Sequence, residues 1–103
     1  MVMVLSQYSR GRAKEYKVMT ILRKTGWLVT RSAASHGPVD IIAAREGKVL
    51  LIQVKSGKAR IRKEELSELI RWGRNFGSDV EVWHFRGRGK IERRRIYSSG
   101  EVN

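Results

Sequence analysis

The sequence contains no cysteine and a single proline, Pro38. Without cysteine, a disulfide framework and a thiolate zinc site are both excluded. The apolar runs are far shorter than the roughly 20 residues that a membrane-spanning helix needs. The segment 1–5 is too short for a signal peptide and has no basic flank before it. We therefore expect a soluble intracellular protein.

Acidic residues are also scarce. The 103 residues include 22 Lys and Arg against 10 Asp and Glu, which gives a formal net charge of +12. A small domain with this imbalance is usually built to meet a polyanion. Nucleic acid is the leading candidate, and an anionic membrane surface is the lesser one. The length allows one core, so we expect a single domain over 1–103 with flexible ends at 1–8 and 98–103.

Hydrophobic periodicity predicts two helices and five strands. Apolar residues at helical spacing predict helices over 9–24 and 64–76, with Ser9 as an N-cap and Gly77 as a stop. Runs rich in β-branched residues predict strands over the following ranges: 27–31, 39–44, 49–55, 79–85 and 90–97. This order predicts an α/β fold, a mixed central sheet of about five strands with helices packed on it.

The hairpin predicted over 39–55 organises the rest of the chain. Asp40, Gln53 and Lys55 interrupt its apolar runs. Side chains alternate along a strand, so Gln53 and Lys55 project to one side, and a turn near Glu46 brings Asp40 close to both. Polar groups are costly to bury without a purpose. One interpretation is a divalent metal beside a scissile phosphate, and the other is a buried ion pair of Asp40 with Lys55.

Glu15 falls on or beside the apolar stripe of the first predicted helix. It either pairs with a neighbour such as Lys14 at the helix boundary or directs its carboxylate toward Asp40. Magnesium prefers oxygen ligands, which Glu15, Asp40 and Gln53 can supply. Lys55 can contact the attacking water or stabilise charge that develops on the phosphate. Together these four side chains are candidates for phosphodiester hydrolysis.

Basic residues surround this candidate site. Those that can contact phosphate lie on the first helix, at the end of the first strand and in the loop that follows Lys55: Arg10, Arg12, Lys14, Arg31, Lys58, Arg60, Arg62 and Lys63. Basic residues on a helix or in a run are often simply solvated, and Arg31 can equally form a structural ion pair. Net charge and closeness to Lys55 favour a phosphate track in the loop 56–63. The basic run 93–95 is typical of a charged edge strand.

These residues resemble the PD-(D/E)xK nuclease superfamily, and more closely the archaeal-type Holliday junction resolvases. Asp40 is followed, after twelve residues, by Gln53-Val54-Lys55, with Glu15 on an upstream helix. The resemblance covers about 11–97. Its segments are 11–15, 26–33, 39–43, 52–55 and 74–77. The catalytic motif alone is loose, but its combination with Arg-Ser-Ala before Asp40 and with the later Phe-Gly is much more specific.

The resemblance implies a restriction-endonuclease-like core and a homodimeric, magnesium-dependent endonuclease that recognises four-way DNA junctions by shape. Manganese is expected to substitute for magnesium. Metal-ligand roles would fall on Glu15 and Asp40, and the catalytic-lysine role on Lys55. Arg31 and Ser32 would lie beside the scissile phosphate. Such a protein is expected in the cytoplasm, either associated with the nucleoid or as a viral protein acting in its host.

Trp72 and Phe76 lie at the end of the second predicted helix. They either belong to the intramolecular core or extend an apolar patch for a partner subunit. The resemblance would put Phe76 near a dimer surface. A dimer also fits the substrate, because a four-way junction has two equivalent strands and a twofold protein presents two sites.

Two positions depart from the family pattern. Gln53 stands where the second acid is usual, and Tyr16 stands where an arginine often follows the helix glutamate. Gln53 keeps an oxygen ligand but removes a negative charge, so metal affinity should be weaker. Alternatives remain open: a nicking or restriction-type nuclease, which would need base-reading elements, a catalytically inactive DNA-binding relative, or a basic RNA-associated domain.

Overall fold

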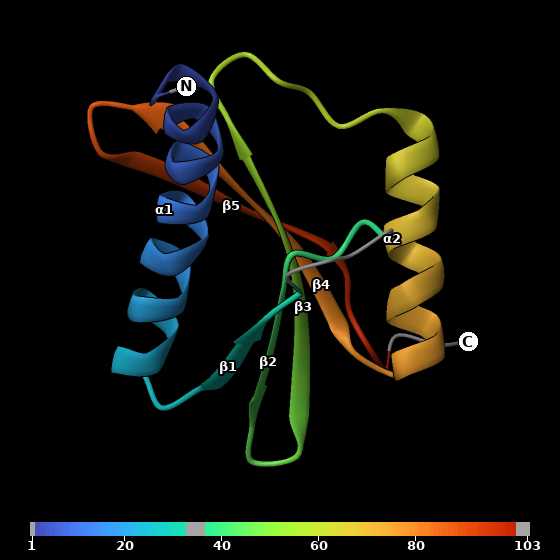
Figure 1. Cartoon of the computed structure of the whole chain (residues 1–103). Helices are drawn as coiled ribbons and strands as arrows, with labels where there is room; N and C mark the ends of the chain where they lie inside the picture. Colours follow the sequence, from blue (N-terminus) through green and yellow to red (C-terminus); the bar gives the residue numbers. More distant parts are fainter. Residues whose placement is uncertain (1, 33–36, 101–103) are drawn as a thin grey trace.

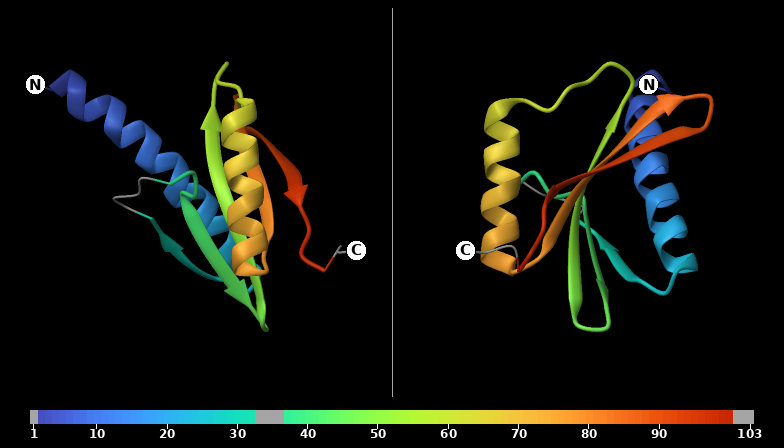
Figure 2. Two further views of the ribbon diagram at one scale, coloured as in Figure 1. Left: turned by 90° about the vertical axis from the view of Figure 1, so that its right-hand side faces the viewer. Right: turned by 180° about the vertical axis from the view of Figure 1, so that it is seen from behind.

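The computed structural model describes residues 2–32 and 37–100, with side chains described from Gly11 onward. A mixed five-stranded sheet lies between two helices, α1 on one face and α2 on the other (Figures 1 and 2). The elements are α1 (Val2–Lys24), β1 (Leu28–Arg31), β2 (Ile41–Arg45), β3 (Lys48–Ser56), α2 (Lys63–Phe76), β4 (Asp79–Gly87) and β5 (Lys90–Tyr97). The predicted α/β architecture is confirmed. Neither helix is long and apolar enough, over the residues described, to cross a membrane.

The strands lie in the sheet in their sequence order, β1-β2-β3-β4-β5. Neighbouring strands are antiparallel except for β3 and β4, which are parallel. A parallel pair needs a crossover connection, and α2 with the loop before it provides one (Figure 1). The loop begins at the C-terminal end of β3, and its basic residues Lys58, Arg60 and Arg62 line a pocket with Lys55.

Each face of the sheet has its own apolar core. The core beneath α1 contains Val18, Met19, Leu22, Ile41, Ala43, Leu50, Ile52, Trp83 and Phe85. The core beneath α2 contains Val39, Leu51, Leu69, Val80 and Val82. Because side chains alternate along a strand, Gln53 and Lys55 share the α2 face with Leu51. The predicted common side of Gln53 and Lys55 therefore follows directly from the observed core.

The first helix begins earlier than predicted, and a residue near the C-terminus contacts β4. α1 begins at Val2, so Ser9 lies inside the helix and is not its N-cap, and the boundary predicted at residue 8 falls within α1. The segment 2–8 contains neither proline nor glycine, so nothing in it breaks the helix. At the other end, Asp79 accepts hydrogen bonds from the backbone N–H and the hydroxyl of Ser99, which ties part of the predicted flexible tail to β4. Residues 101–103 lie outside the described part.

Candidate active site

Asp40 lies just before β2, where the backbone pairing with β3 ends. Its N–H donates to the carbonyl of Ile52 at 2.9 Å, the residue that already pairs with Ile41. Two residues further along β3, the Val54 N–H donates to the Asp40 side chain, with 2.7 Å to Oδ2. The carboxylate thus takes the place of a backbone acceptor at the point where the two strands separate. This fixes its position at the opening of the sheet.

Gln53 lies beside Asp40 on β3. The register of β2 and β3 ends at the pair Ile41–Ile52. The Asp40 carboxylate accepts the N–H of Val54, the residue that follows Gln53 on β3. The Gln53 side chain is buried, and its Oε1 has no hydrogen-bond partner among the described residues. A buried oxygen without a partner is costly. The Asp40 carboxylate is bound at the next residue of β3, and carboxylate and amide oxygens are the ligands that a hard cation prefers.

Lys55 pairs with a residue that no motif of the sequence singles out. Its ammonium nitrogen lies 3.1 Å from Oε2 and 3.3 Å from Oε1 of Glu65, in the first turn of α2. The Glu65 Oε1 also accepts the backbone N–H of Arg62 at 3.0 Å. The interpretation of Lys55 as the direct ion-pair partner of Asp40 is therefore wrong. Glu65 is the N3 residue of α2, and its side chain accepts the N–H of the N-cap residue Arg62. No local pattern in the sequence identifies Lys55 as its ion-pair partner.

Glu15 is directed to Arg31 rather than to Lys14. The Arg31 guanidinium lies 3.1 Å from Glu15 Oε1 and also lies over the Tyr16 ring, 5.3 Å from its centroid. The structural ion pair considered for Arg31 is thus formed, between α1 and β1. Cα pairing places Arg31 opposite Ile41, whose side chain belongs to the core beneath α1. The side chain of Arg31 therefore approaches the candidate site from the α1 side of the sheet.

The pKa of Asp40 is raised to about 6. Burial of the carboxyl is the largest cause, and the negative charges of Glu15 and Glu65 add to it. The Val54 hydrogen bond and the positive charge of Lys55 act in the opposite direction and only partly offset the burial. Asp40 therefore lies within electrostatic reach of all three charged groups. A bound cation would favour its ionised form, which is otherwise disfavoured here.

The predicted site residues thus converge in part. Asp40, Gln53 and Lys55 lie together at the C-terminal end of β3, and Glu15 acts on Asp40 through its charge while contacting Arg31. Within 2–32 and 37–100, no group of three or more His, Asp or Glu side chains forms a ready-made metal site. The oxygen ligands at hand are the Asp40 carboxylate and the unpaired amide oxygen of Gln53. Glu15 as a metal ligand stays a prediction.

A family model described as "Archaeal holliday junction resolvase (hjc)" matches residues 6–92, a range that includes every residue of this site.

The chain belongs to the archaeal Holliday junction resolvase (Hjc) family.

Relatives in the Hjc family support this assignment. The crossover junction endodeoxyribonuclease Hjc of Methanocaldococcus jannaschii is 39% identical over 74 residues, covering 69% of this chain and 55% of the relative. The enzyme of the same name from Sulfurisphaera tokodaii is 34% identical over 85 residues, covering 73% of this chain and 58% of the relative. The chain therefore spans little more than half the length of these relatives.

A solved structure of the Hjc family confirms the fold class. The chain is similar to Hjc of Archaeoglobus fulgidus, described as a Holliday junction resolvase from an archaeal hyperthermophile, with a TM-score of 0.74. The two are 24% identical, and the match covers 84% of this chain and 73% of the solved one. At this identity the likeness speaks for the fold, including the sheet on which the Hjc-family motif lies.

The basic residues predicted to contact phosphate in this Hjc-family chain fall into two groups. Those in the loop before and at the start of α2 are exposed: Lys58, Arg60, Arg62 and Lys63. Arg60 shares a pocket with Lys55, so the loop does border the site. On α1, Lys14 lines a pocket with Gly57, Arg12 is partly buried, and the side chain of Arg10 lies outside the described part. Ser32 is held through its N–H, which donates to the Asp40 carbonyl at 2.9 Å.

Trp72 and Phe76 stack on each other at the end of α2, with 5.8 Å between ring centroids. Trp72 also packs against the core beneath α2, and its indole N–H donates to Glu68 at 3.2 Å. Phe76 is 48% exposed. Trp72 therefore belongs partly to the intramolecular core, whereas Phe76 presents an apolar surface to the outside.

Proposed function

We propose that this chain is a Holliday junction resolvase, an endodeoxyribonuclease that cuts the two equivalent strands of a four-way DNA junction by phosphodiester hydrolysis. One observation carries the proposal: Asp40, Gln53 and Lys55 lie together in a chain of the Hjc family, and the buried Oε1 of Gln53 has no hydrogen-bond partner among the described residues. A formal net charge of +12 suits a DNA substrate. Two relatives named as crossover junction endodeoxyribonucleases support the same activity.

The proposed activity uses a divalent cation, Mg²⁺ with Mn²⁺ as a substitute. Asp40 and Gln53 would hold it through their oxygens, with Glu15 as the third protein ligand. When bound, such a cation neutralises phosphate charge and lowers the pKa of a coordinated water. The raised pKa of Asp40 and the unpaired Gln53 Oε1 are the two features that fit a cation. Because Gln53 stands in place of an acid, this ligand set carries one negative charge fewer.

Lys55 supplies the remaining charge of the proposed site. Its ammonium is held at the C-terminal end of β3 by Glu65, where it can orient the attacking water and stabilise charge that develops on the phosphate. Arg31, which pairs with Glu15, would contact the phosphate from the side opposite to Lys55. The chain's own residues thus bind and orient the phosphate between two cationic groups.

We also infer a homodimer with Phe76 at its interface and Trp72 behind it. An exposed aromatic ring stacked on a partly buried one is a suitable anchor for a subunit contact. Twofold symmetry would present two equivalent sites to the two strands of a junction. Sedimentation of the chain and of Phe76→Ala tests this inference, since the variant should sediment as a monomer.

The decisive experiment is cleavage of a synthetic four-way junction in Mg²⁺ and in EDTA, with linear duplex of the same sequence as control. Junction cleavage that requires Mg²⁺ is expected. Asp40→Asn and Lys55→Ala should abolish cleavage and keep junction binding. Equal cutting of duplex would instead indicate a nicking or restriction-type nuclease. Tight binding without cutting would indicate an inactive DNA-binding relative, for which Gln53 in place of an acid is the supporting observation.

A further inference from the structure

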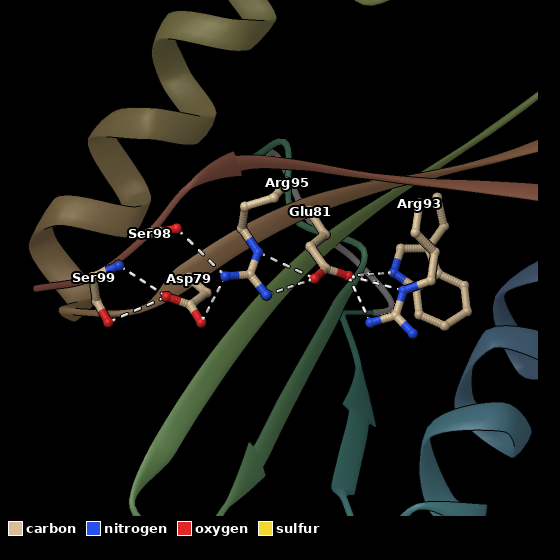
Figure 3. A network of polar contacts seen from close by, with 7 residues as sticks. Asp79, Glu81, Arg93, Arg95, Ser98 and Ser99 are labelled. Atoms are coloured by element: carbon tan, nitrogen blue, oxygen red, sulfur yellow. Dashed lines mark hydrogen bonds and ion pairs between the residues drawn. The ribbon is translucent and has the colours of Figure 1, made fainter. Parts of the chain in front are cut away.

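Strand β5 carries three consecutive arginines, Arg93, Arg94 and Arg95, and alternation sends them to different faces of the sheet. Arg93 and Arg95 point to the α1 side, where both contact the buried carboxylate of Glu81 (Figure 3). Their nitrogens lie 3.0 Å and 2.8 Å from its oxygens. Arg95 also lies 3.2 Å from Asp79. On this face, two arginines therefore meet two carboxylates.

Arg93 and Arg95 are committed to the fold. Burial opposes the ionisation of Glu81, but hydrogen bonds from Arg95, Arg93 and Trp83 outweigh it and lower the pKa of its carboxyl. Arg93 also lies over the Trp83 ring, 4.3 Å from its centroid. A guanidinium held in this way would have to abandon a buried carboxylate in order to bind a phosphate, and an unpaired buried charge is strongly unfavourable. These two arginines are structural.

Arg94 points to the opposite face. It is paired in register with Val82, which belongs to the core beneath α2, so its side chain lies on the same face as Lys55. Arg94 and Lys55 both line a pocket of about 340 Å³, together with Arg60 and Arg86. Glu92 is the only carboxylate that lines this pocket in the described part of the chain, and it is paired with Arg86 at 3.0 Å. Neither Arg94 nor Arg60 has an ion-pair partner among the described residues.

We propose that this pocket is a phosphate-binding site for the DNA strand beyond the scissile phosphate, with Arg94 and Arg60 as its ligands. The proposal rests on the proposed function and adds a DNA path to it, from Asp40 past Lys55 and across β4 to β5. A guanidinium suits this role because its planar fork binds two phosphate oxygens at once. Arg94 alone of the three arginines is both uncommitted and on the face of the candidate active site. A run that is typical of a charged edge strand thus contains one functional side chain.

The test is the salt dependence of junction binding, measured by fluorescence anisotropy in EDTA so that neither metal nor cleavage is needed. Each lost phosphate contact reduces the slope of log affinity against log salt by about 0.9. Arg94→Ala should therefore lower the slope by about 0.9 and weaken binding by roughly three- to tenfold. Lys48→Ala is the control, since Lys48 is exposed at the β2–β3 turn, at the other end of β3. It removes the same charge but should leave the slope at the wild-type value.

The outcomes separate this inference from the proposed function. If the wild type prefers the junction to duplex but Arg94→Ala keeps the wild-type slope, the phosphate site is wrong and the resolvase stands. An equal drop for Arg94→Ala and Lys48→Ala also overturns the site, because only net charge then matters. If the wild type binds duplex as tightly as the junction while Arg94→Ala lowers the slope, the phosphate site stands and junction selectivity fails. A wild type that binds no DNA overturns both.

Discussion

The ammonium of Lys55 lies 3.1 Å from the carboxylate of Glu65, which joins the end of β3 to the first turn of α2. The two residues bracket the basic loop between these elements. Glu65 also brings a negative charge close enough to Asp40 to raise its pKa. The site therefore contains a further carboxylate, which comes from a helix and contacts the lysine.

Glu65→Gln should slow junction cleavage without loss of binding. Glutamine can still accept the Arg62 N–H, so the start of α2 is kept, but it no longer attracts the Lys55 ammonium by charge. Loss of orientation at a reacting group lowers the rate by roughly 10- to 100-fold. Single-turnover cleavage at saturating protein measures the effect. Glu64→Gln, an exposed neighbour, is the control and should cleave at the wild-type rate. A rate for Glu65→Gln equal to that of the control would show that the ion pair serves only the fold.

Asp40 should make the fold less stable as pH rises from about 4 to 6. Burial raises the pKa of Asp40 to about 6, so the folded state binds more protons than the unfolded state in this window. The free energy of unfolding then falls with rising pH and stays low above pH 6. Asp40→Asn removes the titration and should be the more stable protein at pH 7, by at most about 3 kcal/mol.

Urea denaturation in EDTA from pH 4 to 7 measures the Asp40 effect. The difference between wild type and Asp40→Asn isolates this one group, because all other titrating groups are shared. Near pH 4 the two proteins should differ least. An Asn variant that is less stable than wild type at pH 7 would contradict the raised pKa.

Gln53→Glu should strengthen metal binding and weaken the metal-free fold. The substitution places a second carboxylate beside Asp40 in a buried position, so the two charges repel each other when no cation is present. With Mg²⁺, the added charge should lower the half-saturating concentration for cleavage by roughly tenfold. Melting temperatures in EDTA and in Mg²⁺ give an independent measure. Gln53→Leu is the control, because it removes the oxygen and should show no stabilisation by Mg²⁺. Equal metal dependence in all three proteins would place the cation elsewhere.

Gly73→Ala should destabilise the protein, because α2 approaches the sheet closely at this residue. An added Cβ would lie 2.6 Å from Val80 Cγ2 and 2.8 Å from Tyr97 Cδ2. Overpacking of this kind costs about 1–3 kcal/mol. Gly11→Ala is the matched control on α1, where a Cβ meets nothing within 4 Å. It should raise the free energy of unfolding by about 0.5–1 kcal/mol. Thermal or urea unfolding of both variants measures the contrast, and a fall for both would show that helix packing at Gly73 is not the cause.

Local backbone geometry made much of this protein predictable. Alternation along a strand places Gln53 and Lys55 on one face wherever β3 lies, and the bounds of β5 follow from its own pattern. Gly77 ends α2 with a φ of +63°, as a glycine stop requires. The motif from Asp40 to Lys55 lies on one hairpin. The turn of this hairpin folds its second strand back on the first and so brings the residues of the motif together. The start of α1 was mispredicted because Ser9 is a favourable N-cap residue, whereas nothing in the segment 2–8 breaks the helix before it.

Only the tertiary structure decided which charges meet. Lys55 pairs with Glu65 because the crossover brings α2 back over the end of β3, and Glu15 pairs with Arg31 because α1 packs against β1. Alternation separates Arg94 from its two neighbours, but the pairing of β5 with β4 decides that Arg94 shares a face with Lys55. Ion pairs between elements depend on packing over many residues, and the hydrophobic pattern records which face is buried but not which partner lies opposite.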